Sequence, residues 1–167
     1  MSGLFEGFDG SSEEKSRNFD GIETWEMDNV CNLSNMFYES NFNHPIESWS
    51  VGNARNMAGM FSHTPFNQPL DSWDVSNVRD MYAMFRDSEF DQSLSSWDVS
   101  NVENMDEMFA NSKFNHSLDS WKLLAMREKP KDMFLNSAFQ GSLEFFSTIT
   151  PKQYQTYYLE KKWSKTP

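Results

Sequence analysis

Carboxylates at two fixed distances from a tryptophan are the residues of this 167-residue chain with the clearest potential for chemistry. The row two positions before the tryptophan contains Glu47, Asp71 and Asp119, with Ser95 in the remaining place. The row one position after it contains Glu26, Asp74 and Asp98, with Ser50 as the exception. On neighbouring coils about 5 Å apart, such carboxylates could share a cation. The glycine-rich turns typical of calcium ladders are absent, so we favour a solvated negative face and predict no metal ligand.

The histidines and the single cysteine are the other candidates for chemistry. His44 and His116 alternate with glutamine in one position, which indicates a surface site, and His63 lies in a variable loop. Cys31 shares its position with charged residues, so we expect it to be exposed, and no histidine is fixed beside it as a base. No nucleophile elbow, phosphate loop, zinc-protease or dinucleotide motif occurs. We therefore predict no catalytic residue, no cofactor and no enzymatic activity.

These residues belong to a repeated unit of 24 residues. Its anchors are Trp25, Trp49, Trp73, Trp97 and Trp121. Apolar residues recur at fixed offsets from each anchor, including a Met-Phe pair at 60–61, 84–85 and 108–109. An asparagine four residues after the tryptophan recurs as Asn29, Asn53, Asn77 and Asn101. We predict that these asparagines form a hydrogen-bonded ladder to backbone groups of neighbouring coils.

The spacing inside a unit predicts two short elements. Val75 follows Trp73 by two residues, which places both on one face of a short extended segment. Val78, Met84 and Phe85 then follow at helical spacing, with Ser76 or Asn77 as the predicted N-cap. The fold class predicted is therefore a repeat solenoid, leucine-rich-repeat-like, with short parallel strands plus short helical turns in each coil.

Three regions follow from the repeat. Residues 1–24 are predicted to be a partial repeat and an acidic loop, and residues 25–146 a solenoid of five repeats. The fifth repeat is degenerate, with one inserted residue before Met133 and Phe146 in the next tryptophan position. Residues 147–167 are predicted to be a capping helix, over 151–162, with a basic tail.

Two aromatic or thioether rows have alternative interpretations. The tryptophans could stack against sugar rings, and the Met-Phe pairs could form a soft groove for a partner. Because both rows occupy invariant apolar positions in every unit, we favour core packing for both.

Charge and composition exclude several classes. The net charge of −11 disfavours nucleic acid as a partner. Residues 1–121 contain 21 acidic and 6 basic side chains, whereas residues 122–167 contain 4 and 8. This asymmetry could support head-to-tail association, although an unremarkable solvated surface is the simpler interpretation. The sequence predicts no internal disulfide, no membrane insertion and no signal peptide, and hence an intracellular or virion location.

The motif W-D-V-S-N-V-x-[ND]-M-x-x-M-F, at residues 73–85 and 97–109, resembles the BspA-type repeat. This leucine-rich-repeat-like unit occurs in bacterial surface proteins and also in protists and large DNA viruses. The resemblance covers roughly residues 19–146. It implies a leucine-rich-repeat-like solenoid that functions in adhesion or protein interaction, and it implies no active site.

Three functions remain open. The first is a non-enzymatic module for protein interaction or scaffolding. Its candidate partner-facing residues are Arg55, Arg79, Glu103, Arg86, Lys113, Lys161 and Lys162. The second is a minor structural protein, in the capsid or interior of a large DNA virus. The third is a carbohydrate-binding adhesin.

Overall fold

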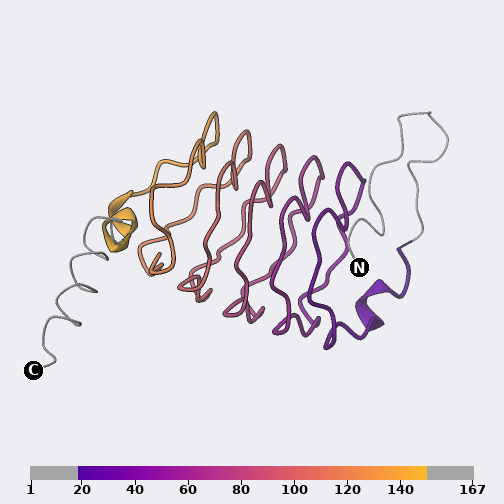
Figure 1. Cartoon of the computed structure of the whole chain (residues 1–167). Coiled ribbons are helices and arrows are strands. Elements are labelled where there is room, and N and C mark those ends of the chain that lie inside the picture. The colour runs from indigo at the N-terminus through magenta and orange to yellow at the C-terminus, as the bar shows by residue number, and fades with distance from the viewer. Residues whose placement is uncertain (1–18, 150–167) are drawn as a thin grey trace, which may run out of the picture.

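The structure, a computed structural model, describes residues 19–149 as coils stacked in a row, each repeating the path of the coil before it (Figure 1). Two short 3-10 helices lie near the ends, η1 over Ile22–Thr24 and η2 over Glu144–Thr148. The described part contains no α-helix and no strand. Isolated parallel bridges join Asn32 to Asn56, Asn56 to Asp80, and Asp80 to Asn104.

The predicted fold class, with a strand and a helical turn in each coil, is therefore wrong. The segment expected to be helical is a series of tight turns in which backbone amides alternate between two uses. Met84 N–H donates to the carbonyl of Met81 three residues earlier, at 3.3 Å, whereas Phe85 N–H donates to Met108 in the next coil, at 2.9 Å. A helix requires successive amides to bond within the same segment. Because every second amide bonds to the next coil, neither a helix nor its predicted N-cap at Ser76 or Asn77 forms.

These turn segments cover residues 34–39, 58–63, 82–87, 106–111 and 131–136. The second and sixth residue of each has positive φ. The second residues are Asn35, Gly59, Ala83, Glu107 and Asp132, and the sixth are Glu39, His63, Asp87, Asn111 and Asn136. Only glycine adopts this region freely, while Asn and Asp tolerate it better than other residues. The alternation of left- and right-handed residues turns every second amide towards the neighbouring coil.

We predict that Gly59→Ala destabilises the protein by about 1–2 kcal/mol. Gly59 has a φ of 63°, and an added Cβ would collide with Oδ1 of Asn35. Gly52→Ala is the matched control, because Gly52 lacks positive φ and its new Cβ would lie 3.2 Å from the exposed Asp74 carboxylate. Urea denaturation should show the midpoint falling for Gly59→Ala only. Equal loss in both variants would contradict this explanation.

Two columns of phenylalanine rings form the centre of the stack. The first column runs through Phe37, Phe61, Phe85, Phe109 and Phe134, with ring centroids 5.6 to 5.7 Å apart. The second runs through Phe42, Phe66, Phe90, Phe114 and Phe139, with centroids 5.7 to 6.3 Å apart. Within a coil the two rings stack at 3.7 to 4.1 Å. The Met-Phe pairs of the regular repeats are buried, so the predicted core role is confirmed for them.

The repeated tryptophan contributes both a ring and a hydrogen-bond donor. Trp49, Trp73, Trp97 and Trp121 are buried, which confirms the core interpretation for these four. Each indole N–H donates to a carbonyl of the preceding coil, at 2.9 to 3.1 Å. Trp25 differs, because it is 36% exposed.

The predicted asparagine ladder is confirmed for three of its members. The side-chain amides of Asn53, Asn77 and Asn101 donate to backbone carbonyls 25 residues earlier, at 2.6 to 2.8 Å. Each asparagine therefore fastens one coil to the coil before it, which explains its fixed place in the repeat.

The end of the stack departs from the prediction in one residue. Phe146 was expected in the tryptophan position, yet Phe145 is the buried ring and packs edge-on against Trp121 at 6.3 Å. The predicted helix over 151–162 and most of the predicted region 1–24 lie outside the described residues. Within residues 19–149, no helix is long and apolar enough to cross a membrane.

Candidate binding surface

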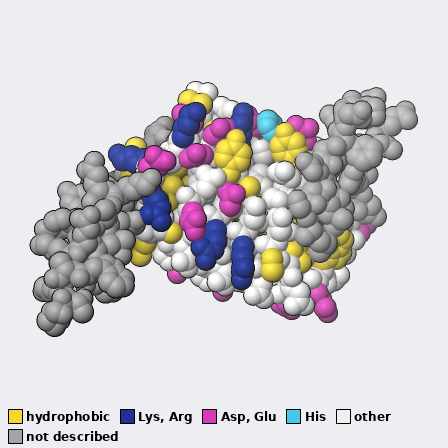
Figure 2. Space-filling model, in the orientation of Figure 1, with side chains coloured by type: hydrophobic (Ala, Val, Ile, Leu, Met, Phe, Trp, Pro, Cys, Tyr) yellow, Lys and Arg dark blue, Asp and Glu magenta, His cyan; other side chains and the backbone are white. Residues whose placement is uncertain are grey.

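The turn segments place their outward side chains side by side on one flank of the stack. We call seven of these residues the turn face: Tyr38, His63, Tyr82, Arg86, Asp87, Glu107 and Asn111. All seven are exposed or half-buried. Figure 2 shows a face of the molecule on which acidic, basic and hydrophobic side chains are intermixed. Unlike the core positions, the positions of the turn face differ from one repeat to the next.

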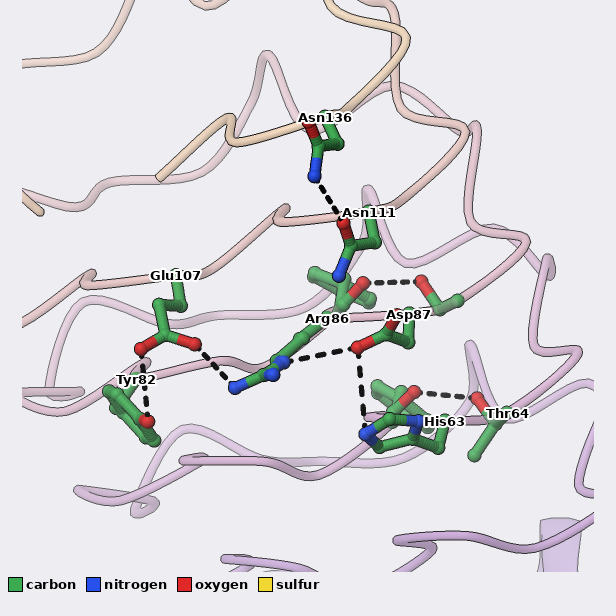
Figure 3. A network of polar contacts seen from close by, with 11 residues as sticks. His63, Thr64, Tyr82, Arg86, Asp87, Glu107, Asn111 and Asn136 are labelled. Atoms are coloured by element: carbon green, nitrogen blue, oxygen red, sulfur yellow. Dashed lines mark hydrogen bonds and ion pairs between the residues drawn. The ribbon is translucent and has the colours of Figure 1, made fainter. Parts of the chain in front are cut away.

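Arg86 is the centre of a polar network that joins three coils (Figure 3). Its Nε donates to the Asp87 carboxylate at 3.0 Å, and its Nη1 donates to Glu107 at 2.5 Å. Tyr82 donates its hydroxyl to the same Glu107 carboxylate at 3.4 Å. On the other side, His63 Nε2 lies 3.5 Å from the Asp87 carboxylate. The network fixes the orientation of long side chains that would otherwise be mobile.

The two carboxylates raise the pKa of Arg86, mainly through the hydrogen bond with Asp87 and further through the charge of Glu107. Arg86 is therefore a permanent cation held between two anions. Tyr82 shares the Glu107 carboxylate with Arg86 and is 39% exposed. Tyr38 packs edge-on against His63 at 5.7 Å. The arrangement offers oriented rings and charges for binding.

The structure places the predicted partner-facing residues in three different settings. Arg79 and Glu103 form an exposed ion pair at 2.7 Å, which is worth at most about 1 kcal/mol. Arg55 and Lys113 are exposed, whereas Arg86 is half-buried within the network. Lys161 and Lys162 lie outside the described residues.

Two carboxylates of the second acidic row, Asp74 and Asp98, accept local hydrogen bonds. Asp74 accepts hydrogen bonds from the hydroxyl and N–H of Ser76, at 2.6 and 3.0 Å, and these lower its pKa. Asp98 has a lowered pKa for the same reason, through Ser100. Within residues 19–149 no group of three or more His, Cys, Asp or Glu side chains is arranged to hold a metal ion.

Ser76→Ala should raise the pKa of Asp74 towards its unfolded value of about 3.9. A lowered folded pKa adds stability that is present above the unfolded pKa and is lost as the pH falls through the folded pKa. The variant should therefore lose a small part of its stability above about pH 4 and none in strong acid. NMR titration of the Asp74 carboxyl measures this shift. Ser100→Ala is the control, because it should move Asp98 and leave Asp74 near its original value.

The sequence pattern did not reveal the roles of two sets of polar positions, one that joins neighbouring coils and one that fixes a turn within a coil. His116 was interpreted as a surface residue, yet its Nε2 lies 3.0 Å from the carbonyl of Asp91 in the preceding coil. Gln68 and Gln92 bond to the preceding coil from the same position. A second set has a hydroxyl that donates to the carbonyl of the phenylalanine three residues earlier: Ser40, Thr64, Ser88, Ser112 and Ser137. The recurrence of Ser or Thr at this position was a visible signal.

The prediction that Cys31 is exposed is confirmed.

The family model described as Mycoplasma protein of unknown function, DUF285, matches residues 1–121 and again residues 66–162. No curated protein and no solved structure matches the chain.

Proposed function

We propose that this chain, which belongs to the DUF285 family of Mycoplasma proteins of unknown function, is a non-enzymatic module that binds a protein partner through its turn face. The supporting observation is that buried and outward positions behave differently within each repeat. The buried positions are the same in successive coils, whereas the outward positions of the turn segments change from coil to coil. Outward positions that vary on a fixed scaffold are the pattern expected of a recognition surface.

The composition of the turn face supports a protein as the ligand. Tyrosine and arginine are enriched among residues that dominate binding energy at protein interfaces. Tyr82 and Arg86 are both held by Glu107, so little side-chain entropy is lost when a partner binds. The resemblance of residues 73–85 and 97–109 to BspA-type repeats also favours adhesion or protein interaction over catalysis.

A second candidate function is a structural role inside a larger assembly, such as a virion. The charge asymmetry favours it, since 21 acidic and 6 basic side chains up to residue 121 are followed by 4 and 8 beyond it. Opposite charges at the two ends would let copies or neighbouring subunits associate in a fixed direction. Both candidates are consistent with an intracellular or virion location.

Capture from the native source tests the proposal. Immobilised chain should retain a protein that the double variant Tyr82→Ala, Arg86→Ala retains at least about tenfold less well, the loss typical of interface hot spots. The control is Arg55→Ala, Lys113→Ala, which removes two exposed cations outside the turn face and should bind normally. Equal capture by both double variants would contradict the proposal. Stoichiometric recovery of the chain in purified particles would instead support the structural role.

A further inference from the structure

We propose that a second site, the cleft between the coils that begin at Trp97 and Trp121, binds an extended segment of a protein partner through a main-chain hydrogen bond to the Glu103 carbonyl. The cleft has a volume of about 530 Å³ and lies between residues 103–106 and residues 124–129. Its size is within the range of about 300–1,000 Å³ of ligand pockets. This inference rests on the proposed function in one respect, that the ligand is a protein. Its site lies outside the turn face.

Backbone hydrogen bonds form a ladder between the regular coils. In one direction, Arg79 N–H donates to the Arg55 carbonyl at 2.9 Å, and Glu103 N–H donates to the Arg79 carbonyl at 2.8 Å. In the other direction, Met81 N–H donates to the Asn104 carbonyl at 2.9 Å. Each coil thus presents one carbonyl and one amide to the coil that follows it.

This ladder stops at the coil that begins at Trp97. Among the described residues, the Glu103 carbonyl and the Met105 amide make no hydrogen bond. Pairing resumes with Glu107 N–H, which donates to the Lys131 carbonyl at 2.9 Å. A buried backbone group without a partner is costly, and Met105 is buried. The interrupted step is adjacent to the cleft, because Glu103 and Asn104 line it.

Two departures of the degenerate coil explain the interruption. A regular coil reaches the preceding one through an asparagine side chain, as Asn101 does with the Ser76 carbonyl at 2.8 Å. The next coil has Ala125 in that position. Ala125 has no side-chain amide, and its backbone N–H donates to the Ser100 carbonyl instead, at 3.0 Å. An extra residue then precedes Pro130, so the backbone over 125–129 leaves the register of the ladder.

The exposed Glu103 carbonyl, which lines the cleft, determines the chemistry of the ligand. An extended segment can donate an N–H to it, as Arg55 N–H does to the Cys31 carbonyl in the coil before. Glu103 and Asp106 make that wall of the cleft acidic, so a basic side chain is favoured there. Arg79 shows the same pairing from the other side, at 2.7 Å from Glu103. Across the cleft, Leu124 is 56% exposed and offers an apolar contact.

The test uses a peptide with the sequence of residues 53–57, Asn-Ala-Arg-Asn-Met, acetylated and amidated, and the full chain labelled for NMR. We expect saturable shifts of backbone amides confined to residues 103–106 and 124–129. The same peptide N-methylated at its arginine amide cannot donate to Glu103, and it should bind about tenfold more weakly, as expected for one lost hydrogen bond.

A chain variant provides the matched control. Ala125→Asn combined with deletion of Lys129 restores the regular repeat, so its own backbone should occupy the ladder and peptide shifts should disappear. Absence of shifts in the unaltered chain, equal binding of the N-methylated peptide, or peptide binding by a folded restored variant would each overturn the proposal. If the restored variant does not fold, the comparison of the unmethylated and N-methylated peptides on the unaltered chain still tests the proposal. Tyr82→Ala, Arg86→Ala should bind the peptide normally, which separates this site from the turn face.

Discussion

Phe85→Ala is expected to destabilise the protein by about 3–5 kcal/mol, the range for removal of a large buried aromatic side chain. Phe85 is fully buried and stacks on Phe61 at 5.6 Å, on Phe109 at 5.7 Å and on Phe90 at 4.0 Å. The truncation would leave a void in the middle of both ring columns, and the flanking coils cannot close it because their backbones are fixed to each other by the ladder. Chemical denaturation measures the loss.

The matched control is Phe134→Ala, in the same column at its last coil. Phe134 is only half-buried and has its column neighbour, Phe109, on one side. We expect its truncation to cost less than half as much as that of Phe85. If both truncations cost the same, the ring columns would not be the main source of cohesion between coils.

Trp97→Phe is expected to destabilise the protein by about 2–3 kcal/mol, although the substitution keeps an aromatic ring. The indole N–H of Trp97 donates to the Leu70 carbonyl at 2.9 Å, in a buried setting. Phenylalanine fills less volume and removes the indole donor, while the Leu70 carbonyl keeps its second donor, the backbone N–H of Trp73, at 3.0 Å. The lost hydrogen bond adds about 0.5–1.5 kcal/mol to the cost of the lost packing.

Tyr82→Phe serves as the control for Trp97→Phe. It also removes a polar group from an aromatic side chain, but Tyr82 is exposed and its bond to Glu107 is long, at 3.4 Å. We expect a change within about 0.5 kcal/mol. Thermal denaturation of both variants tests the comparison, and a small effect of Trp97→Phe would show that the indole donor is dispensable.

The repeat allowed the core to be predicted but not the backbone conformation. Apolar residues at a fixed period of 24 identify buried positions whatever path the chain takes between them, so Trp73 and Phe85 were placed correctly. The spacing of Val78, Met84 and Phe85 is the same in a helix and in a series of tight turns, and the pattern alone cannot distinguish them. Asn35 and Gly59 in one repeat position were the available signal, because both residue types favour positive φ.

The candidate site was predictable only in part, because its contacts join residues that no motif connects. Arg86 was identified as a variable outward residue, but its partner Glu107 lies 21 residues away and in a different repeat position. The pairing depends on the exact rotation of one coil against the next, which the period does not specify. The cleft is a different case, since the inserted residue before Pro130 was visible in the sequence and its effect on backbone pairing was not.

Hydroxyl-radical footprinting of the chain with and without its captured protein partner shows whether the partner contacts the turn face. Oxidation of Tyr38 and Tyr82 is expected to fall when the partner binds, because both rings belong to the turn face. Leu143, which is 51% exposed outside the turn face, should be oxidised equally in both states. Unchanged oxidation of the two tyrosines, together with protection of Leu143, would contradict the assignment of partner recognition to the turn face.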